Sequence, residues 1–199
     1  MKAEDIVAVV LAGGEGRRIG GGKPGLMLGG RTLLDRALER AEGYAAKVGI
    51  AVRAQSQIVA PTGVTLLTDD PSIAGPLSGI ASALAFAKQQ GAAAVLTLPC
   101  DAPFLPDDLA MRLAEALTPG LGVAVAKSGR QWHPICALWR AGLDQALRTY
   151  AATGRGSLMG LAEAVGWTPV DWIAEPVDPF FNINSREDLA GAEKLLTTQ

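Results

Sequence analysis

An apolar run at residues 6–11 leads directly into a glycine-rich segment, and this junction constrains the fold more than any other stretch of the chain. Residues 9–25 hold seven glycines and the cations Arg17, Arg18 and Lys23. An apolar run of this length indicates a buried strand. The glycines behind it allow backbone N–H groups to approach an anion closely, because no Cβ intervenes. The junction therefore predicts a βα unit with an anion site at the carboxyl end of its strand.

Apolar runs of strand length alternate with segments of helical period along the rest of the chain. Strands are expected at 6–11, 47–52, 65–67, 93–98, 122–126 and 135–139. Helices are expected at 33–45, 75–90, 140–150 and 157–165, with two more opening at Pro106 and at Ser185. This alternation is typical of a mostly parallel sheet covered by helices. We expect an α/β fold, a single Rossmann-like three-layer α/β/α domain.

Composition narrows the class of protein further. The chain has 199 residues, 49% of them hydrophobic, which suits one domain with a sizeable core. A net charge of −2 argues against a nucleic acid polymer or an anionic membrane as partner. No apolar stretch approaches the roughly 20 residues of a membrane span, and the N-terminus does not resemble a signal peptide. We expect a cytoplasmic protein.

Cysteine and histidine are scarce. Cys100 and Cys136 are the two cysteines, they form no CxxC pair, and the chain has a single histidine. This usage argues against a structural zinc site or a disulfide framework. Free cysteine behaves mainly as a small hydrophobic residue, so both are expected to be ordinary buried thiols.

The glycine segment has the chemistry of a polyphosphate site. Backbone amides and the cations Arg17, Arg18 and Lys23 can share phosphate oxygens, although a flexible turn with solvated cations is the plainer alternative. The segment is not a P-loop, because Lys23 is followed by Pro24 instead of serine or threonine. It fits a dinucleotide fingerprint poorly, because Ile19 occupies the position of the third glycine.

Acidic residues lie near the same sheet edge. Asp101 follows the strand at 93–98, where it could hold a divalent metal against phosphates, since magnesium commonly uses one or two carboxylates. It could instead cap the helix that opens at Pro106. Asp69 and Asp70 precede a glycine turn. They could accept hydrogen bonds from N1 and N2 of a guanine ring, or act as helix-dipole partners.

Five blocks of sequence resemble those of the molybdenum cofactor guanylyltransferases, a family of the nucleotidyltransferase superfamily. The blocks are LAGGEGRRIGGGKPGLMLGGRTLL, GPLSGI, LPCDAPFLP, HPICALW and FFNINSREDL, and they run in family order over residues 11–189. The resemblance implies transfer of GMP from GTP to the terminal phosphate of molybdopterin, with Mg²⁺ as cofactor and pyrophosphate as second product. It also implies a nucleotide-binding part at 1–117 and a substrate-binding part at 118–199. The looser pattern after residue 119 separately predicts a sub-lobe at 118–177, packed on the main sheet.

The resemblance also assigns roles by matching position. Residues expected to bind the nucleotide are Leu11, Ala12, Gly13, Gly14, Lys23, Asp70 on the guanine side, and Asp101. Residues expected to be catalytic are Arg18 and Lys23 on the triphosphate and Asp101 on Mg²⁺. Residues expected on the pterin side are His133, Asn182 and Asn184. His133 could instead be a partly buried residue satisfied by backbone, and the two asparagines could simply shape their loop.

Three functions remain open at this stage. The first is GMP transfer to molybdopterin, with a molybdoenzyme or its chaperone as a candidate protein partner. A related cytidylyltransferase or sugar-phosphate nucleotidyltransferase would use the same first loop. A non-catalytic nucleotide-binding module for molybdoenzyme maturation would bind GTP without releasing pyrophosphate.

Overall fold

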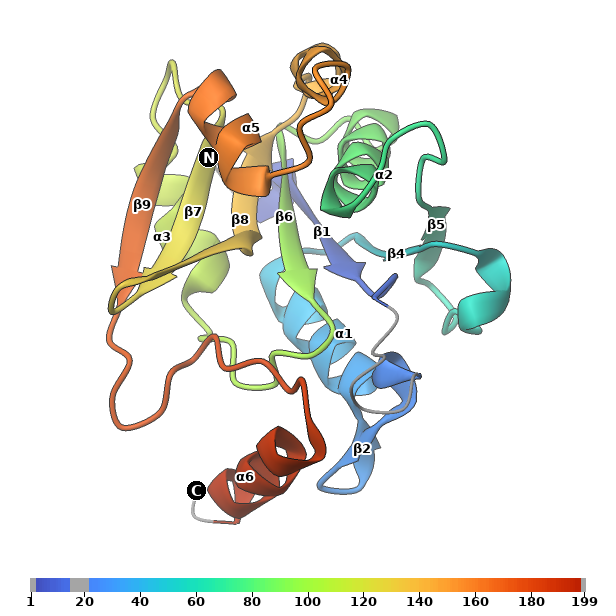
Figure 1. Ribbon diagram of the computed structural model, residues 1–199, viewed down its shortest axis with the longest axis vertical. Coiled ribbons are helices and arrows are strands. Elements are labelled where there is room, and N and C mark those ends of the chain that lie inside the picture. Colours follow the sequence, from blue (N-terminus) through green and yellow to red (C-terminus); the bar gives the residue numbers. More distant parts are fainter. Residues whose placement is uncertain (1–2, 15–21, 198–199) are drawn as a thin grey trace.

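The computed structural model describes residues 3–14 and 22–197, which form a seven-stranded sheet with helices on both faces (Figure 1). The strands are β1 (Ile6–Leu11), β4 (Val48–Val52), β5 (Thr65–Thr68), β6 (Ala94–Pro99), β7 (Val123–Ser128), β8 (Gln131–Arg140) and β9 (Trp167–Trp172). Their order is β5-β4-β1-β6-β8-β7-β9, and β8 alone runs antiparallel to its neighbours. The expected mostly parallel α/β sheet is confirmed. The four strands predicted in the first half lie within one residue of their expected bounds.

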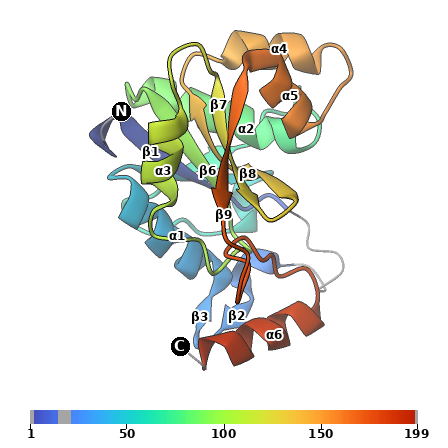
Figure 2. The ribbon, with the colours of Figure 1, turned by 90° about the vertical axis from the view of Figure 1, so that its left-hand side faces the viewer.

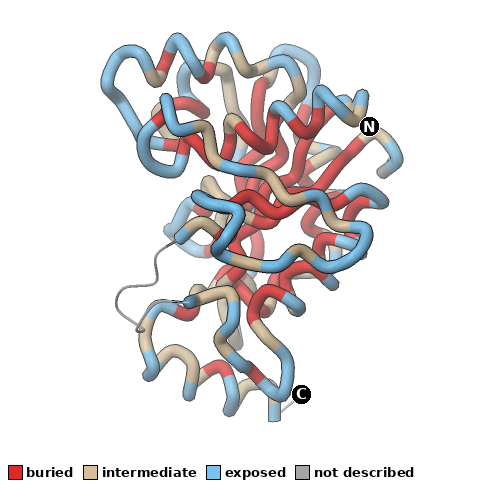
Figure 3. The backbone as a smooth tube through the Cα atoms, turned by 90° about the vertical axis from the view of Figure 1, so that its right-hand side faces the viewer, coloured by how far each residue is buried: buried red, intermediate tan, exposed pale blue. Residues whose placement is uncertain are grey.

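Two cores cover the two faces of the sheet. The helices are α1 (Leu33–Tyr44), α2 (Pro76–Gln89), α3 (Leu109–Ala116), α4 (Asp144–Ala151), α5 (Leu158–Val165) and α6 (Arg186–Leu196). Ala8 and Val10 of β1 face α1 and α3, whereas Val7 and Val9 face α2, α4 and α5. Figure 2 shows these two sets of helices on opposite sides of the strands. Since both faces are covered, β1 and β6 read as continuous apolar runs. Figure 3 shows the buried residues concentrated in the middle of the molecule.

Helix α1 forms where its apolar stripe predicts. Thr32 and Asp35 make a reciprocal capping box at its start. The predicted stripe is buried from Leu33 to Ala41, and its members from Leu34 onward pack against the sheet. A short hairpin of β2 (Met27–Leu28) and β3 (Arg31–Thr32) connects the glycine segment to this helix. Gly29 and Gly30 both have positive φ at its two-residue turn, as a tight hairpin of this kind requires.

A third, smaller core lies apart from the sheet. Leu28, Leu33, Ile183 and Ala192 are buried together there, joining the β2–β3 hairpin to α6. Figure 1 shows α6 beside β2, away from the strands of the main sheet. The end of the glycine segment and the residues that precede α6 are therefore held by the same cluster. A short 3₁₀ turn at Lys23–Gly25 begins this part of the chain.

The expected sub-lobe at 118–177 is wrong. Strands β7, β8 and β9 extend the main sheet beyond β6, with Thr97 of β6 opposite Ala137 of β8. Strand β9 was not predicted, because Pro169 interrupts its pattern; a proline is tolerated there since β9 is an edge strand. Strand β8 runs to Arg140, so the helix expected from residue 140 begins at Asp144.

Candidate functional site

Three distant segments meet at one carboxyl-end edge of the sheet. Asp101 follows β6, Lys23 begins the 3₁₀ turn after the glycine segment, and Asn184 lies just before α6. The Lys23 ammonium donates hydrogen bonds to the Asp101 carboxylate and to Asn184 Oδ1, the latter at 2.8 Å. The backbone N–H of Ile183 donates to the Asp101 carbonyl oxygen at 2.9 Å. Asp101 is therefore held both through its backbone and through its side chain.

A cavity of about 320 Å³ opens beside Lys23 and Asp101. Leu11, Gly13 and Gly14, which the family resemblance assigns to the nucleotide, line it. These residues belong to the end of β1 and the start of the glycine segment, so their backbone is available at the cavity wall. The cavity therefore has the position expected for a nucleotide in an open α/β sheet.

Gly13 allows its loop to lie against the neighbouring strand ends. A Cβ added there would lie 3.2 Å from Asp69 Oδ2 and 3.3 Å from both the backbone nitrogen and Cγ of Arg53. Such contacts leave almost no room for a side chain, so a larger residue would displace Asp69 or Arg53 from the cavity wall. Glycine at this position thus shapes the cavity itself.

The predicted nucleotide-side acid needs a correction, because Asp69 and not Asp70 lines the cavity. The Asp70 carboxylate is turned to the other side, where it accepts hydrogen bonds from Arg148 at 2.9 Å and from the Ser72 backbone at 2.9 Å. These residues follow β5, where successive side chains point to opposite faces, so a register error of one residue exchanges the two sides. Both acids are candidates from the sequence, but the family resemblance assigns the guanine side to Asp70.

Asp69 is half-buried. Its Oδ2 accepts a hydrogen bond from Ser78 Oγ at 3.2 Å. Burial raises the pKa of Asp69, and the Ser78 hydrogen bond and the nearby Arg53 charge oppose this rise. The carboxylate is therefore stabilised by two partners in an environment that otherwise penalises its charge.

Ala12 and Arg18 are two further residues predicted to contact the nucleotide or its phosphates. Ala12 does not line the cavity: its side chain is buried in the core and its backbone N–H donates to Ala51 at 2.8 Å. Alternation along the end of β1 turns Ala12 inward while Leu11 and Gly13 reach the cavity wall. Arg18, predicted on the triphosphate, lies outside the described residues.

A second cavity, of about 430 Å³, adjoins the first. His133, Asn182 and Asn184, all predicted on the pterin side, line it together. Asp101 lines both cavities. The site thus consists of two compartments with one carboxylate at their boundary, an arrangement that can hold two substrates with their reacting groups beside Asp101.

His133 is held by side chains. Its Nε2 is 2.7 Å from Ser128 Oγ, which in turn donates to Asp178 Oδ2 at 2.9 Å. Its ring stacks on Phe180, with ring centroids 4.6 Å apart. Burial lowers the pKa of His133, and the nearby Asp178 carboxylate opposes the change. The alternative that backbone groups satisfy His133 is wrong, because its partner is the hydroxyl of Ser128.

Asn184 combines both roles considered for it. Its side chain binds Lys23, and its backbone N–H donates to Asp188 Oδ2 at 2.8 Å at the start of α6. Ser185 and Asp188 form the predicted capping box. Hydrogen bonds from the Asn184 and Ser185 backbone N–H groups help to lower the pKa of Asp188. The cap therefore sets the backbone from which Asn184 reaches Lys23.

Comparison with known proteins identifies the family. A family model described as the MobA-like NTP transferase domain matches residues 8–173. The chain belongs to this NTP transferase family. The molybdenum cofactor guanylyltransferase of Sinorhizobium fredii is 39% identical over 198 residues, covering 95% of this chain and 91% of that protein. That of Cereibacter sphaeroides is 39% identical over 193 residues, covering 96% and 97%.

Solved structures share the fold. Molybdopterin-guanine dinucleotide biosynthesis protein A from Archaeoglobus fulgidus is similar with a TM-score of 0.75 at 23% identity, covering 98% of this chain and 100% of that one. The 2-C-methyl-D-erythritol 4-phosphate cytidylyltransferase of Thermus thermophilus has a TM-score of 0.69 at 22% identity, covering 96% and 98%. The expectation of a nucleotidyltransferase enzyme is confirmed by the family match and the curated relatives.

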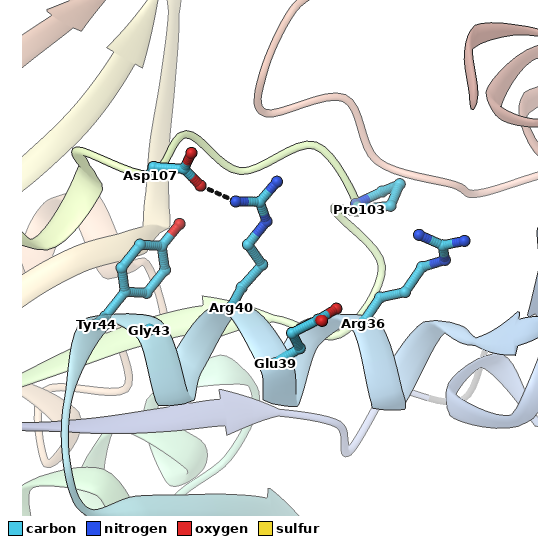
Figure 4. Close-up of a pocket in the computed structure, with 7 residues that line it drawn as sticks. All are labelled: Arg36, Glu39, Arg40, Gly43, Tyr44, Pro103 and Asp107. Atoms are coloured by element: carbon cyan, nitrogen blue, oxygen red, sulfur yellow. Dashed lines mark hydrogen bonds and ion pairs between the residues drawn. The ribbon is translucent and has the colours of Figure 1, made fainter. Parts of the chain in front are cut away.

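Other features of this NTP transferase are peripheral to the site. A cavity of about 490 Å³ lies along α1, lined by Arg40, Tyr44 and Asp107 among others (Figure 4). Arg40 pairs there with Asp107, and the Tyr44 hydroxyl donates to the Pro106 carbonyl at 2.7 Å, so these polar groups already have partners. None of the residues predicted for the site lines it.

The two thiols are buried, as expected. Burial raises the pKa of Cys100 to about 12 and that of Cys136 further, so both are un-ionised at neutral pH. Within residues 3–14 and 22–197 no group of three or more histidine, cysteine or acidic side chains is placed to hold a metal ion. None of the helices described is both long and apolar enough to cross a bilayer.

Sequence reasoning missed Ser128 and Asp178, which support His133, and Ser78, which supports Asp69. Ser78 stands in the GPLSGI block and Asp178 just before FFNINSREDL, so both lie near recognised motifs. Ser128 carries no such signal. It meets His133 diagonally across the β7–β8 hairpin, because His133 pairs with Ala126, two residues before Ser128 on the same strand.

Proposed function

We propose that this NTP transferase transfers GMP from GTP to the terminal phosphate of molybdopterin, forming molybdopterin guanine dinucleotide and pyrophosphate. The observation that carries the proposal is Asp101 at the boundary of two adjoining cavities, paired with Lys23. Such an arrangement suits a donor nucleotide and an acceptor phosphate that react beside one carboxylate. The names of the curated relatives support the choice of substrates.

The first cavity would hold GTP. Leu11, Gly13 and Gly14 would contact the nucleotide, and Lys23 would bind the triphosphate together with Arg18. Asp69 would accept hydrogen bonds from N1 and N2 of guanine, which both donate, whereas cytosine offers a different pattern. Because Asp69 is buried enough for its pKa to rise, a base that brings no donor to the carboxylate would replace its water contacts without a new hydrogen bond, and this favours guanine.

Asp101 fits a magnesium ligand. One of its carboxylate oxygens accepts the Lys23 hydrogen bond, and the other has no hydrogen-bond partner in the described part of the chain. Every fully buried side-chain oxygen in the described residues has a hydrogen-bond partner, so this unpaired oxygen is not fully buried and is accessible. A single carboxylate suffices for Mg²⁺ when phosphates and water complete its ligands. Bound there, the ion would neutralise charge on the phosphates.

The reaction is an in-line displacement at the α-phosphorus of GTP. An oxygen of the acceptor phosphate forms a bond to the α-phosphorus, and the bond to the bridging oxygen of pyrophosphate breaks. A phosphate monoester has a second pKa of about 6, so the nucleophile is already anionic and needs no general base. This agrees with a chain whose single histidine is engaged by Ser128. Lys23 and the loop amides would stabilise the transferring group by position and charge.

The proposal is tested by pyrophosphate release from GTP on addition of molybdopterin. In parallel, GTP should protect the protein against thermal unfolding where CTP and UTP do not. Release with CTP instead of GTP would establish the cytidylyltransferase alternative. GTP binding without pyrophosphate release would establish the non-catalytic module. Residues 1–117 as the nucleotide part, 118–199 as the acceptor part, a molybdoenzyme or its chaperone as partner, and a cytoplasmic location stay predictions.

A further inference from the structure

A chain of hydrogen bonds behind the second cavity determines where the proton of His133 resides. Ser128 Oγ lies 2.9 Å from Asp178 Oδ2 and 2.7 Å from His133 Nε2. A carboxylate only accepts, so the single hydroxyl proton of Ser128 is donated to Asp178. The hydroxyl oxygen must then accept from His133, and the imidazole proton lies on Nε2. Nδ1 of the neutral ring is consequently a hydrogen-bond acceptor.

The geometry of this chain is held from several sides. Asp178 Oδ1 accepts a hydrogen bond from the Phe180 backbone N–H at 2.9 Å, so the two carboxylate oxygens have separate partners. The Phe180 ring stacks on His133 at an interplanar angle of 19° and meets Trp172 edge to face. Ser128 and Phe180 are each only 2% exposed. The imidazole therefore has one orientation in which Nε2 reaches the hydroxyl.

Nδ1 is the second ring nitrogen of His133. It has no hydrogen-bond partner among the residues that the structure describes. Every fully buried side-chain nitrogen in that part of the chain has a partner, so Nδ1 cannot be fully buried. Nδ1 is therefore accessible, and the second cavity is the one that His133 lines. Because burial lowers the pKa of His133, the neutral ring is favoured over the imidazolium.

We propose that Ser128 and Asp178 are positioning residues that hold His133 as its Nε2–H tautomer, so that Nδ1 accepts a hydrogen bond from an N–H or O–H group of the acceptor substrate. This rests on the proposed function in that the second cavity is taken as the acceptor site. A pterin ring carries such N–H donors at its edge. A ligand that presents only acceptors at this position would leave Nδ1 facing a lone pair and would bind weakly.

The tautomer can be measured directly. His133 is the only histidine in the chain, so the two ring nitrogens give an unambiguous ¹⁵N NMR spectrum of histidine-labelled protein. We expect the Nε2–H tautomer in the wild-type protein at neutral pH. In Asp178→Asn, the Phe180 N–H keeps the amide oxygen and the amide NH₂ faces Ser128. The hydroxyl then donates to Nε2, and the proton moves to Nδ1.

The KM values for the two substrates distinguish a positioning role of Asp178 from a purely structural one. In Asp178→Asn, Nδ1 becomes a donor that opposes the substrate donor, so KM for the acceptor should rise roughly 10- to 100-fold, with the KM for GTP unchanged. Ser128→Ala should leave a mixture of tautomers and a smaller rise. Asp171→Asn is the matched control, because Asp171 pairs with Lys127 on the neighbouring strand and lies outside this chain. It should change neither the spectrum nor KM.

Two results would overturn the inference. A wild-type spectrum that shows Nδ1–H or the imidazolium at neutral pH would contradict the assigned tautomer. A normal acceptor KM in Asp178→Asn, with the proton moved, would contradict the role of Nδ1 in binding. Failure of the wild-type protein to release pyrophosphate would instead refute the proposed function, while the NMR measurement would still decide the tautomer.

Discussion

Replacing Asp101 by asparagine removes one negative charge at the boundary of the two cavities with little change of shape. The Lys23 and Asp101 side chains are 11% and 16% exposed. Breaking a fully buried ion pair costs about 3–5 kcal/mol. In the variant, Lys23 keeps its hydrogen bond to Asn184 and can donate to the new amide oxygen at position 101. Both side chains also remain partly exposed to solvent. We therefore expect a loss of about 1–2 kcal/mol, which lowers Tm by roughly 2–8 °C.

The effect of Asp101→Asn on turnover should be far larger than its effect on stability. Losing one charge-stabilising group at a reaction centre typically lowers kcat by about 10²–10³-fold, and here the proposed metal ligand is lost as well. The assay is pyrophosphate release at saturating GTP and molybdopterin over a series of Mg²⁺ concentrations. Circular dichroism and a thermal melt of the same sample establish that the variant is folded.

Asp107→Asn is the matched control for Asp101→Asn. Asp107 lies on the same loop after β6, its side chain is 90% exposed, and it pairs with Arg40 outside both cavities. The control should keep wild-type turnover. If Asp101→Asn also kept wild-type kcat and the same Mg²⁺ dependence, the assignment of Asp101 to the reaction would be refuted.

Three further predictions address the base, the core and the final helix. Asp69→Asn should weaken GTP binding by roughly tenfold and reduce its preference over CTP, whereas Asp70→Asn should not; calorimetric titration with both nucleotides decides. Gly122→Ala should lower the free energy of unfolding by about 1–3 kcal/mol, because its Cβ would lie 2.6 Å from Cγ2 of Val165 on α5. Gly43→Ala on α1, where the added Cβ meets no atom within 4 Å, should instead raise it by about 0.5–1 kcal/mol. Urea titrations measure both changes. Asp188 has a lowered folded-state pKa, so its stabilising effect is present above the ordinary value of 3.8 and is lost as pH falls through the folded pKa; the stability deficit of Asp188→Ala should therefore shrink in acid, and a deficit independent of pH would contradict this.

Much of the fold follows from local pattern. Continuous apolar runs predict β1, β4 and β6 because a strand covered on both faces must be apolar on both. The one-sided stripe from Leu33 to Ala41 predicts α1 as a helix with a single buried face. The carboxyl ends of parallel strands share one edge, so the sequence could place Asp101 on the same edge as the glycine segment. Its contact with Lys23 and the position of Asn184 beside them agree with that expectation.

Other features depend on contacts between residues far apart in the chain. Local pattern carries no information on strand partners, so the antiparallel direction of β8 could not be anticipated, and Pro169 hid the edge strand β9. A shift of one residue after β5 turns Asp69 to the cavity and Asp70 to Arg148. The proton of His133 depends on a serine and an aspartate that are 5 and 45 positions away in sequence. Periodicity reports which face of an element is buried, whereas pairing and side-chain direction arise only when the whole sheet assembles.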